Sequence, residues 1–311
     1  MINKLFTKTN LILLLILSLG LFLRTYQLRE RFLYGHDQDL AGWVIKDVVV
    51  NRHFRLIGQE TSTQGIFIGP LFYYLQIPFY LLTGMDPIGG TYLFTILGLI
   101  TIVSIYFIFT KVFDRNTGLI GALVYAISFY TIYNDREAVP TMPVILWSVW
   151  FFYALNLLLQ GKQKLAYIFF GILIGLIWHL NFALILPVVL IPIAFYLSKA
   201  KYKFKDPVAG IFTFFVVSLP LLLFELRHGF QQAKAIYYSI TIPQSDVTYS
   251  GYQKLERVWL LMTKNVSGLF IGSLRWFNFE TISLAMILVF AILVLRKKIS
   301  KNLAILMFLW I

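Results

Sequence analysis

The chain has 311 residues, of which 59% are hydrophobic, 17% aromatic and 13% charged, whereas soluble domains carry roughly 25% charged residues. Its long charge-free apolar runs predict a helical protein that crosses a membrane several times. The net charge of +13 does not indicate a nucleic-acid partner, because Lys and Arg separate the apolar runs and form no single patch. The absence of cysteine excludes disulfides and thiolate ligands.

The first apolar run, Leu11 to Leu23, follows Lys4 and Lys8. A cleaved signal peptide can have a run of this length, but the next four residues, Arg24 to Gln27, offer no small-residue cleavage site. We therefore expect a retained span with its N-terminus in the cytoplasm. Arg24, at the end of this span, is expected to reach the membrane surface.

A polar outer loop is predicted over residues 24–87. Within it, Asp39 to Asn51 has the pattern of an amphipathic helix, with Leu40, Trp43, Val44 and Val48 on one face. Such a helix is expected to lie in the plane of the membrane surface, with its apolar side toward the lipid chains.

The charge-free run from Ile66 to Gly84 has two interpretations, a membrane span or a second surface helix. If it lies on the surface, nearly all the excess positive charge of the short loops falls on one side of the membrane, as expected for a cytoplasmic side. If it crosses, every later loop changes sides and this asymmetry disappears. We therefore predict a second interfacial helix from Gly69-Pro70 to Gly84, with Pro78 interrupting it.

The remaining chain is predicted to form a bundle, and the whole of residues 1–311 a single all-α transmembrane domain. Spans are expected at about 88–110, 117–133, 139–160, 164–180, 182–198, 207–226 and 281–295, with a second outer loop over 227–280. Polar residues also gather at Tyr133 to Glu137, which is expected to be a polar outer segment. The last apolar run, Asn302 to Ile311, lacks the polar residues that usually follow a span, so we expect a C-terminally truncated chain.

Asp37 and Asp39 are the candidate catalytic residues, because a carboxylate near the membrane surface can take a proton from an attacking hydroxyl. For Asp39 the alternative is a structural role as the cap of the following helix, where Asp is favoured. Asp37 has no such alternative explanation.

Other outer-face side chains are candidates for substrate binding: Arg52, Arg55, Glu60, Tyr74, Arg136 and His179. The arginines could bind a lipid phosphate through bidentate contacts, or could only anchor the loop to anionic headgroups. Arg136, in Asp135-Arg136-Glu137, could instead belong to a solvated turn. His36, Glu60 and His179 with an aspartate could hold a divalent metal ion, but their spacing matches no ligand pattern, and we assign no metal site.

The order of these features resembles the glycosyltransferases of GT-C type, and in particular the bacterial branch of the glycosyltransferase 39 and protein-mannosyltransferase-like family. The strings that carry the resemblance are Gly35-His36-Asp37-Gln38-Asp39, Leu56-Ile57-Gly58-Gln59-Glu60-Thr61, Gly69-Pro70-Leu71-Phe72-Tyr73-Tyr74 and Trp178-His179-Leu180-Asn181. The resemblance extends over about residues 8–226. It departs from relatives in the start of the second interfacial helix, Ile68-Gly69-Pro70, and in the segment after Arg136, which lacks an aspartate found in some of them.

The resemblance implies a GT-C fold and an enzyme that transfers a hexose or pentose from a polyprenyl-phosphate carrier on the extracytoplasmic face of the cell membrane. The acceptor would be a lipid, a glycan or a protein, and Asp37 would occupy the position of the family's catalytic base. The alternatives are a transporter or flippase of a lipid-linked or anionic substrate, and a non-catalytic scaffold. A transporter needs charged groups at mid-membrane, which the predicted spans largely lack, and a scaffold leaves Asp37 and Asp39 unexplained.

Overall fold

The computed structural model describes residues 7–141, 143–198, 205–241, 256–261, 288–295 and 299–310. These residues are mainly helical. Extended backbone pairs at an isolated antiparallel β-bridge between Glu60 and Phe67. Three described helices are long and apolar enough to cross a membrane: α1 (Lys8–Thr25), α4 (Gly89–Val112) and α10 (Lys205–Arg227). The predicted all-α membrane architecture is therefore confirmed.

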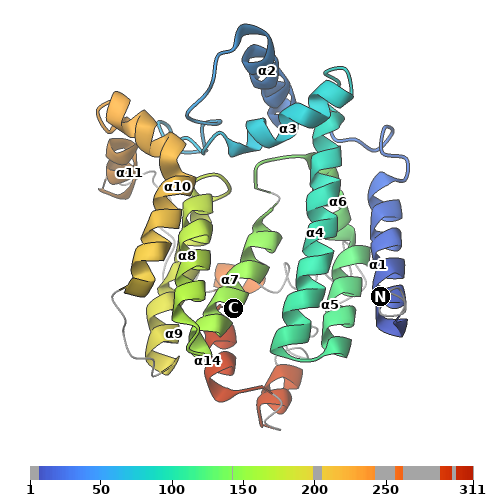
Figure 1. Cartoon of the computed structure of the whole chain (residues 1–311). Helices are drawn as coiled ribbons and strands as arrows, with labels where there is room; N and C mark the ends of the chain where they lie inside the picture. Colours follow the sequence, from blue (N-terminus) through green and yellow to red (C-terminus); the bar gives the residue numbers. More distant parts are fainter. Residues whose placement is uncertain are drawn as a thin grey trace.

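The bundle has two groups of helices, which α7 (Val144–Leu159) joins by packing against both α4 and α8 (Figure 1). The first group consists of α1, α4, α5 (Arg115–Ile127) and α6 (Phe129–Glu137). The second group consists of α8 (Gln163–Ile177), the 3₁₀ helix η2 (Phe182–Val189), α9 (Leu190–Ser198) and α10. The short helix α14 (Lys301–Trp310) packs against α9 and α7.

Helices α8 and α10 approach each other closely because glycine lies at their contact. A Cβ atom added at Gly171 would lie 1.9 Å from the carbonyl oxygen of Gly210, so no larger residue fits there. Small residues at helix contacts are typical of membrane bundles, where close packing replaces the hydrophobic effect.

Helices α2 (His36–Asn51) and α3 (Leu71–Leu82) lie together at one end of the bundle, and α3 runs across the direction of α4 (Figure 1). With 12 residues, α3 is about 18 Å long and is too short for a hydrocarbon core of about 30 Å. The short helix agrees with the charge-based prediction for residues 66–84, but its position relative to the membrane stays a prediction. The helix is shorter than expected and continues through Pro78.

The buried side of α2 consists of Gln38, Ala41, Ile45 and Val48, of which Ala41 and Ile45 pack with residues of α3. Trp43 is exposed, with Lys46 over its ring. The stripe that α3 covers is therefore next to Trp43, and contact of the predicted apolar face with lipid stays a prediction.

Two predicted spans are divided. The span predicted over 117–133 consists of α5 and α6, with extended backbone at Ser128 between them. The Thr131 hydroxyl lies 2.8 Å and 3.0 Å from the carbonyl oxygens of Tyr125 and Ser128, next to the break. The span predicted over 182–198 begins with the eight residues of η2. Because a 3₁₀ helix rises about 2.0 Å per residue, η2 and α9 together extend about 30 Å and match the hydrocarbon core.

The chain after α10 forms α11 (Gln231–Thr241), and most of the predicted outer loop over 227–280 lies outside the described residues. Of the span predicted over 281–295, residues 288–295 are described and are helical.

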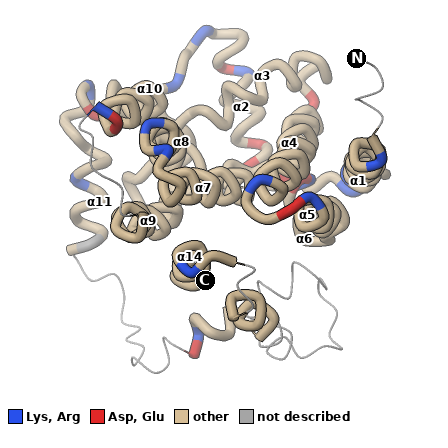
Figure 2. The backbone as a smooth tube through the Cα atoms, turned by 60° about the horizontal axis from the view of Figure 1, so that its bottom comes forward, with Lys and Arg blue, Asp and Glu red and all other residues tan. Residues whose placement is uncertain are grey.

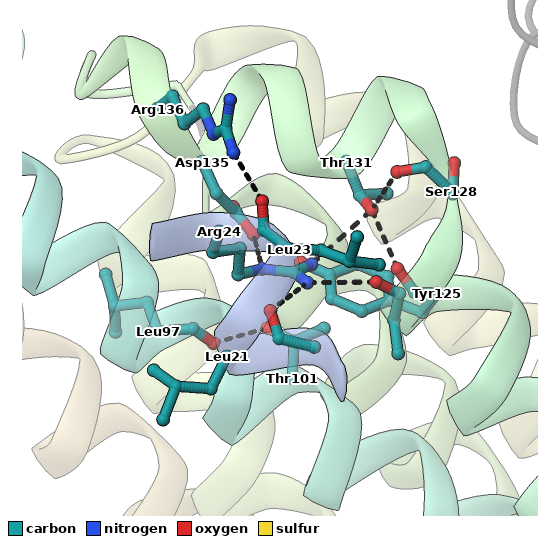
Figure 3. Close-up of polar contacts among 12 residues, drawn as sticks. Leu21, Leu23, Arg24, Leu97, Thr101, Tyr125, Ser128, Thr131, Asp135 and Arg136 are labelled. Carbon is teal, nitrogen blue, oxygen red and sulfur yellow. Dashed lines mark hydrogen bonds and ion pairs between the residues drawn. The ribbon is translucent and has the colours of Figure 1, made fainter. Parts of the chain in front are cut away.

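Arg24 forms a buried ion pair with Asp135 (Figure 3). The Arg24 side chain is fully buried, its Nε lies 2.6 Å from Asp135 Oδ2, and its Nη1 donates to the carbonyl oxygens of Gly20 and Ala126. A Cβ atom at Gly98 would lie 2.4 Å from the Asp135 carboxylate, so glycine leaves the space for this pair. The prediction that Arg24 reaches the membrane surface was therefore wrong, because α6 stays in the bundle and brings Asp135 to Arg24. Asp135 and Arg136 of the predicted polar segment 133–137 are buried, although Glu137 contacts α2 at the same end of the bundle.

We expect an Arg24→Met substitution to lower the free energy of unfolding by about 3–5 kcal/mol, because it leaves the Asp135 charge buried without its partner. Unfolding of the purified protein in detergent, by heat or denaturant, measures this change. The matched control is Arg29→Met, since Arg29 and Asp86 form an exposed ion pair at 3.4 Å that should contribute about 0–1 kcal/mol. Equal stability of the two variants would contradict a structural role of the Arg24–Asp135 pair.

Candidate active site

The first turn of α2 carries both candidate acids and is fixed by Gln38. Gly35, not Asp39, holds the N-cap position, and its N–H donates to Gln38 Oε1 at 2.8 Å. The Gln38 side chain is buried and its Nε2 donates to the carbonyl oxygen of Glu137, at the end of α6. The alternative of Asp39 as helix cap is therefore wrong, since the helix begins three residues earlier than predicted.

The two acids occupy different environments. Asp39 is exposed and accepts a hydrogen bond of 2.6 Å from the Tyr34 hydroxyl. Asp37 is half-buried, and its Oδ1 lies 3.4 Å from Nε2 of Gln59. Both carboxylates lie in the first helical turn, where the helix dipole favours negative charge. Only Asp37 faces the segment that returns from the far end of α2.

This returning segment begins at Arg52 and carries Arg55 part of the way back toward Asp37. Arg52 is exposed at the C-terminal end of α2, which places it roughly 20 Å along the helix from Asp37. Arg55 is held by Tyr74, whose hydroxyl bonds to the backbone N–H and carbonyl of Arg55, both at 2.8 Å. Its guanidinium lies 3.0 Å from Asp47. Of the two arginines, the structure therefore brings Arg55 closer to the candidate base.

The pKa of Tyr73, on α3, depends on the charges around the phenol. Burial raises the pKa of Tyr73 to about 12, Arg55 acts to lower it, and Asp37 acts to raise it further. The phenol therefore lies within electrostatic reach of both Asp37 and Arg55. At the far end of α2, hydrogen bonds from Asn51 and then from Arg55, together with nearby His53, hold the pKa of Asp47 below its usual value.

A cavity of about 800 Å³ lies beside this region, between the 59–68 segment, the α6–α7 connection, α8, η2, α10 and α11. Its polar wall includes Gln59, Glu60, Ser62, Thr141 and Asn181. Its apolar wall includes Ile174, Ile177, Phe182, Ile185 and Phe214. One cavity therefore offers hydrogen-bonding groups beside a hydrocarbon-like surface.

Glu60 contributes a carboxylate to this cavity. Its side chain is exposed, and Oε1 accepts a hydrogen bond of 2.5 Å from the backbone N–H of Gly65. Asp37 itself does not line the cavity. Gln59, which lines it, is the described residue whose side chain bonds to Asp37.

The polar wall is held by a short hairpin, residues 58–69. Its two arms pair through Gly58 N–H to the Ile68 carbonyl at 2.6 Å and Ile68 N–H to the Gln59 carbonyl at 3.0 Å. Gly69 N–H donates to the carbonyl of Trp178 at 2.6 Å, and Phe67 N–H donates to Gln232 Oε1 on α11 at 3.0 Å. The hairpin is therefore fixed to the end of α8 and to α11.

His179 lies under this hairpin and not in the cavity wall. It is buried, its Nε2 lies 3.0 Å from the carbonyl oxygen of Val217, and its ring packs directly against Gly69. Its observed contacts support the hairpin. Its predicted role in substrate binding stays a prediction.

Arg136 is buried and points to the end of α1, where its Nη2 donates to the carbonyl oxygens of Leu23 and Tyr26 (Figure 3). The predicted role of Arg136 in substrate binding therefore also stays a prediction.

The structure does not bring His36, Glu60 and His179 together. Within the described residues, no three His, Asp or Glu side chains lie close enough to hold one metal ion. We therefore do not carry the alternative of a divalent metal site further.

A model of the dolichyl-phosphate-mannose-protein mannosyltransferase family matches residues 68–224, just over half of the chain. The chain belongs to this family. It is therefore a membrane glycosyltransferase with a polyprenyl-phosphate-linked sugar as donor. Comparisons with curated proteins and with solved structures find no match. The matched residues of this glycosyltransferase include α3, which packs against α2, and the α6–α7 connection and the end of α8, which line the cavity, whereas Asp37 precedes them.

Two residues of this site escaped the sequence analysis. Gln38 and Gln59 appeared only inside the strings that carried the resemblance, and no spacing or composition marks their amides. Their contacts depend on a helix end and a hairpin that meet only in the folded chain.

We expect a Gly69→Ala substitution in the glycosyltransferase to lower the free energy of unfolding by about 1–3 kcal/mol, because its Cβ would lie 2.0 Å from His179 Nδ1. A second substitution, His179→Ala, should restore part of the loss by vacating that space. Thermal unfolding in detergent measures both effects.

The control for this prediction is Gly42→Ala, inside α2, where the nearest atom to a new Cβ is 3.7 Å away. It should be neutral or slightly stabilising, because alanine favours a helix interior. A Gly69→Ala protein as stable as wild type would contradict the close packing of His179.

Proposed function

We propose that this glycosyltransferase transfers a hexose or pentose to an acceptor on the extracytoplasmic face of the cell membrane, with Asp37 as general base. The observation that carries the proposal is the position of Asp37, half-buried at the bundle end and linked through Gln59 to the 800 Å³ cavity. We regard the described helices, together with the hairpin of residues 58–69, as parts of a single transmembrane catalytic domain.

The cavity suits the two chemical halves of the donor. Its polar wall can bind sugar hydroxyls and phosphate oxygens, and Ile174, Ile177 and Phe214 can contact the isoprenoid chain. Ile185 lines the cavity and has an exposed side chain, so it can also contact the isoprenoid chain.

In the proposed reaction the oxygen of an acceptor hydroxyl attacks the anomeric carbon of the donor sugar. Its proton passes to a carboxylate oxygen of Asp37, and the bond from the anomeric carbon to the phosphate oxygen breaks. The electron pair leaves with the polyprenyl phosphate. General-base catalysis of this kind contributes about 10²–10⁴-fold. Arg55 is the arginine best placed to stabilise the leaving phosphate, since it acts on the same phenol, Tyr73, as Asp37 does.

Asp39 remains the second candidate for the base. Its carboxylate is exposed and bonded to Tyr34, and it has no contact with the cavity wall in the described structure. The arrangement therefore favours Asp37.

The charges at the opposite end of the bundle support the proposed orientation. Figure 2, which brings that end forward, shows Lys and Arg near the ends of α5, α8 and α14. The basic residues of that end are Lys8, Lys111, Arg115, Lys162, Lys164, Lys205 and Lys301, against Asp114 and Asp206. By the positive-inside rule this end faces the cytoplasm, and α2, α3 and the cavity face outward.

We expect Asp37→Asn to lower sugar transfer by about 10²–10⁴-fold without impairing binding of the donor. The assay measures release of polyprenyl phosphate from polyprenyl-phosphate-linked sugars, mannose first, by mass spectrometry with host membranes as acceptor source. Asp39→Asn should retain most of the activity. Near-normal release by Asp37→Asn, with a large loss in Asp39→Asn, would move the base to Asp39.

The absence of cysteine from the chain allows a direct test of orientation. Gln64→Cys, in the hairpin, should react with a membrane-impermeant maleimide in intact cells, whereas Lys162→Cys should react only after the membrane is permeabilised. Both positions are exposed in the structure. The reverse pattern of labelling would place the cavity on the cytoplasmic side.

A further inference from the structure

Gln59 is the described residue that touches both the candidate base and the cavity. Its Nε2 lies 3.4 Å from Asp37 Oδ1, and its side chain forms part of the polar cavity wall. Because a carboxylate only accepts hydrogen bonds, the amide NH₂ must face Asp37. The amide carbonyl is therefore left to interact elsewhere.

The Gln59 carbonyl oxygen is buried, and within the described residues nothing donates a hydrogen bond to it. A buried acceptor without a donor is destabilising, so such a group needs an explanation. Gln59 lines the cavity although this oxygen is itself buried, so a small rotation of the amide on donor binding would bring the oxygen within reach of a sugar hydroxyl, which is a hydrogen-bond donor.

The backbone around Gln59 is held firmly enough to fix this side chain. The Gln59 carbonyl accepts from Ile68 N–H, and the neighbouring Gly58 N–H donates to the Ile68 carbonyl. A Cβ atom at Gly58 would lie 2.7 Å from the Gly69 carbonyl oxygen, so the two arms are in close contact. On the other side, Gln38 fixes the turn that carries Asp37. Both partners of the Gln59–Asp37 contact therefore have restricted positions.

We propose that Gln59 is a positioning residue that sets the donor sugar in register with the general base, its NH₂ orienting Asp37 and its carbonyl accepting a hydrogen bond from a sugar hydroxyl. The inference rests on the proposed role of Asp37. Donation by Gln59 stabilises the charged carboxylate, which is the form that accepts the proton in the reaction. The sugar hydroxyl supplies the donor that the carbonyl oxygen otherwise lacks.

The test compares three variants of the full-length enzyme in the polyprenyl phosphate release assay, as a function of pH. Gln59→Leu removes both polar contacts. Gln59→Glu keeps the shape but replaces the donor by a second carboxylate. Gln64→Leu is the matched control, because Gln64 is exposed on the same hairpin and does not line the cavity.

The inference predicts an upward shift of the acid limb of kcat/KM by about half to one pH unit in Gln59→Leu, because Asp37 loses a hydrogen bond to its charged form. The shift should be larger in Gln59→Glu, because a second carboxylate beside Asp37 disfavours its charged form. KM for the donor should rise about 3- to 10-fold in Gln59→Leu, for loss of one hydrogen bond. Gln64→Leu should keep the wild-type pH profile and KM.

The inference would be overturned if the acid limb of kcat/KM lay at the same pH in both Gln59 variants as in wild type. So would an activity of Gln59→Glu above that of Gln59→Leu at the wild-type optimum, because shape alone would then explain the residue. If Gln59→Leu does not fold, Gln59→Met replaces it as an unbranched apolar side chain of similar length. Asp37→Asn, measured in the same assay, separates the two claims. If Asp37→Asn keeps activity, the assignment of Asp37 as the base fails. If Asp37→Asn is inactive while the Gln59 variants match wild type, only the inference about Gln59 fails.

Discussion

The buried ion pair between Arg24 and Asp135 is the interaction on which the active end of the molecule depends. It joins the end of α1 to α6, two elements more than 100 residues apart in the chain. Burial makes the pair sensitive to the loss of either partner, since a single charge left behind has neither water nor a counter-ion. Carbonyl oxygens of Gly20 and Ala126 accept from Nη1, and the Thr131 hydroxyl accepts from Nη2, so the pair is also well hydrogen-bonded.

The two residues after Asp135 extend this connection toward the candidate base. Arg136 binds the carbonyls of Leu23 and Tyr26, where the chain leaves α1, and the carbonyl of Glu137 accepts from Gln38 in the first turn of α2. The position of Asp37 therefore follows from contacts in the bundle and not from the local sequence of the outer loop. The hairpin 58–69, held to α8 and α11, brings Gln59 to the same place from the other side.

The sequence predicted the features that depend on composition and charge along the chain. Charge asymmetry predicted that residues 66–84 do not form a span, and the structure has a helix of only 12 residues there. The apolar runs indicated the bundle. The ion pair could not be predicted in this way, because Arg24 and Asp135 each resemble a residue at a membrane surface. Only the break at Ser128, which keeps α6 within the bundle, makes them partners. The N-cap at Gly35 was missed because glycine has no side chain that marks a cap, and the hydrogen bond from Gly35 N–H to Gln38 forms only once the helix begins at His36.

The central claim is that the sugar binds on the side of the cavity next to Asp37. A structure of the full-length protein in lipid with a bound polyprenyl-phosphate-linked sugar tests it most directly. The account predicts the anomeric carbon on the Gln59 side of the cavity, with room for one acceptor hydroxyl between that carbon and the Asp37 carboxylate. The account would be contradicted if the anomeric carbon lay against α11 and η2, with Gln59 and the hairpin between it and Asp37.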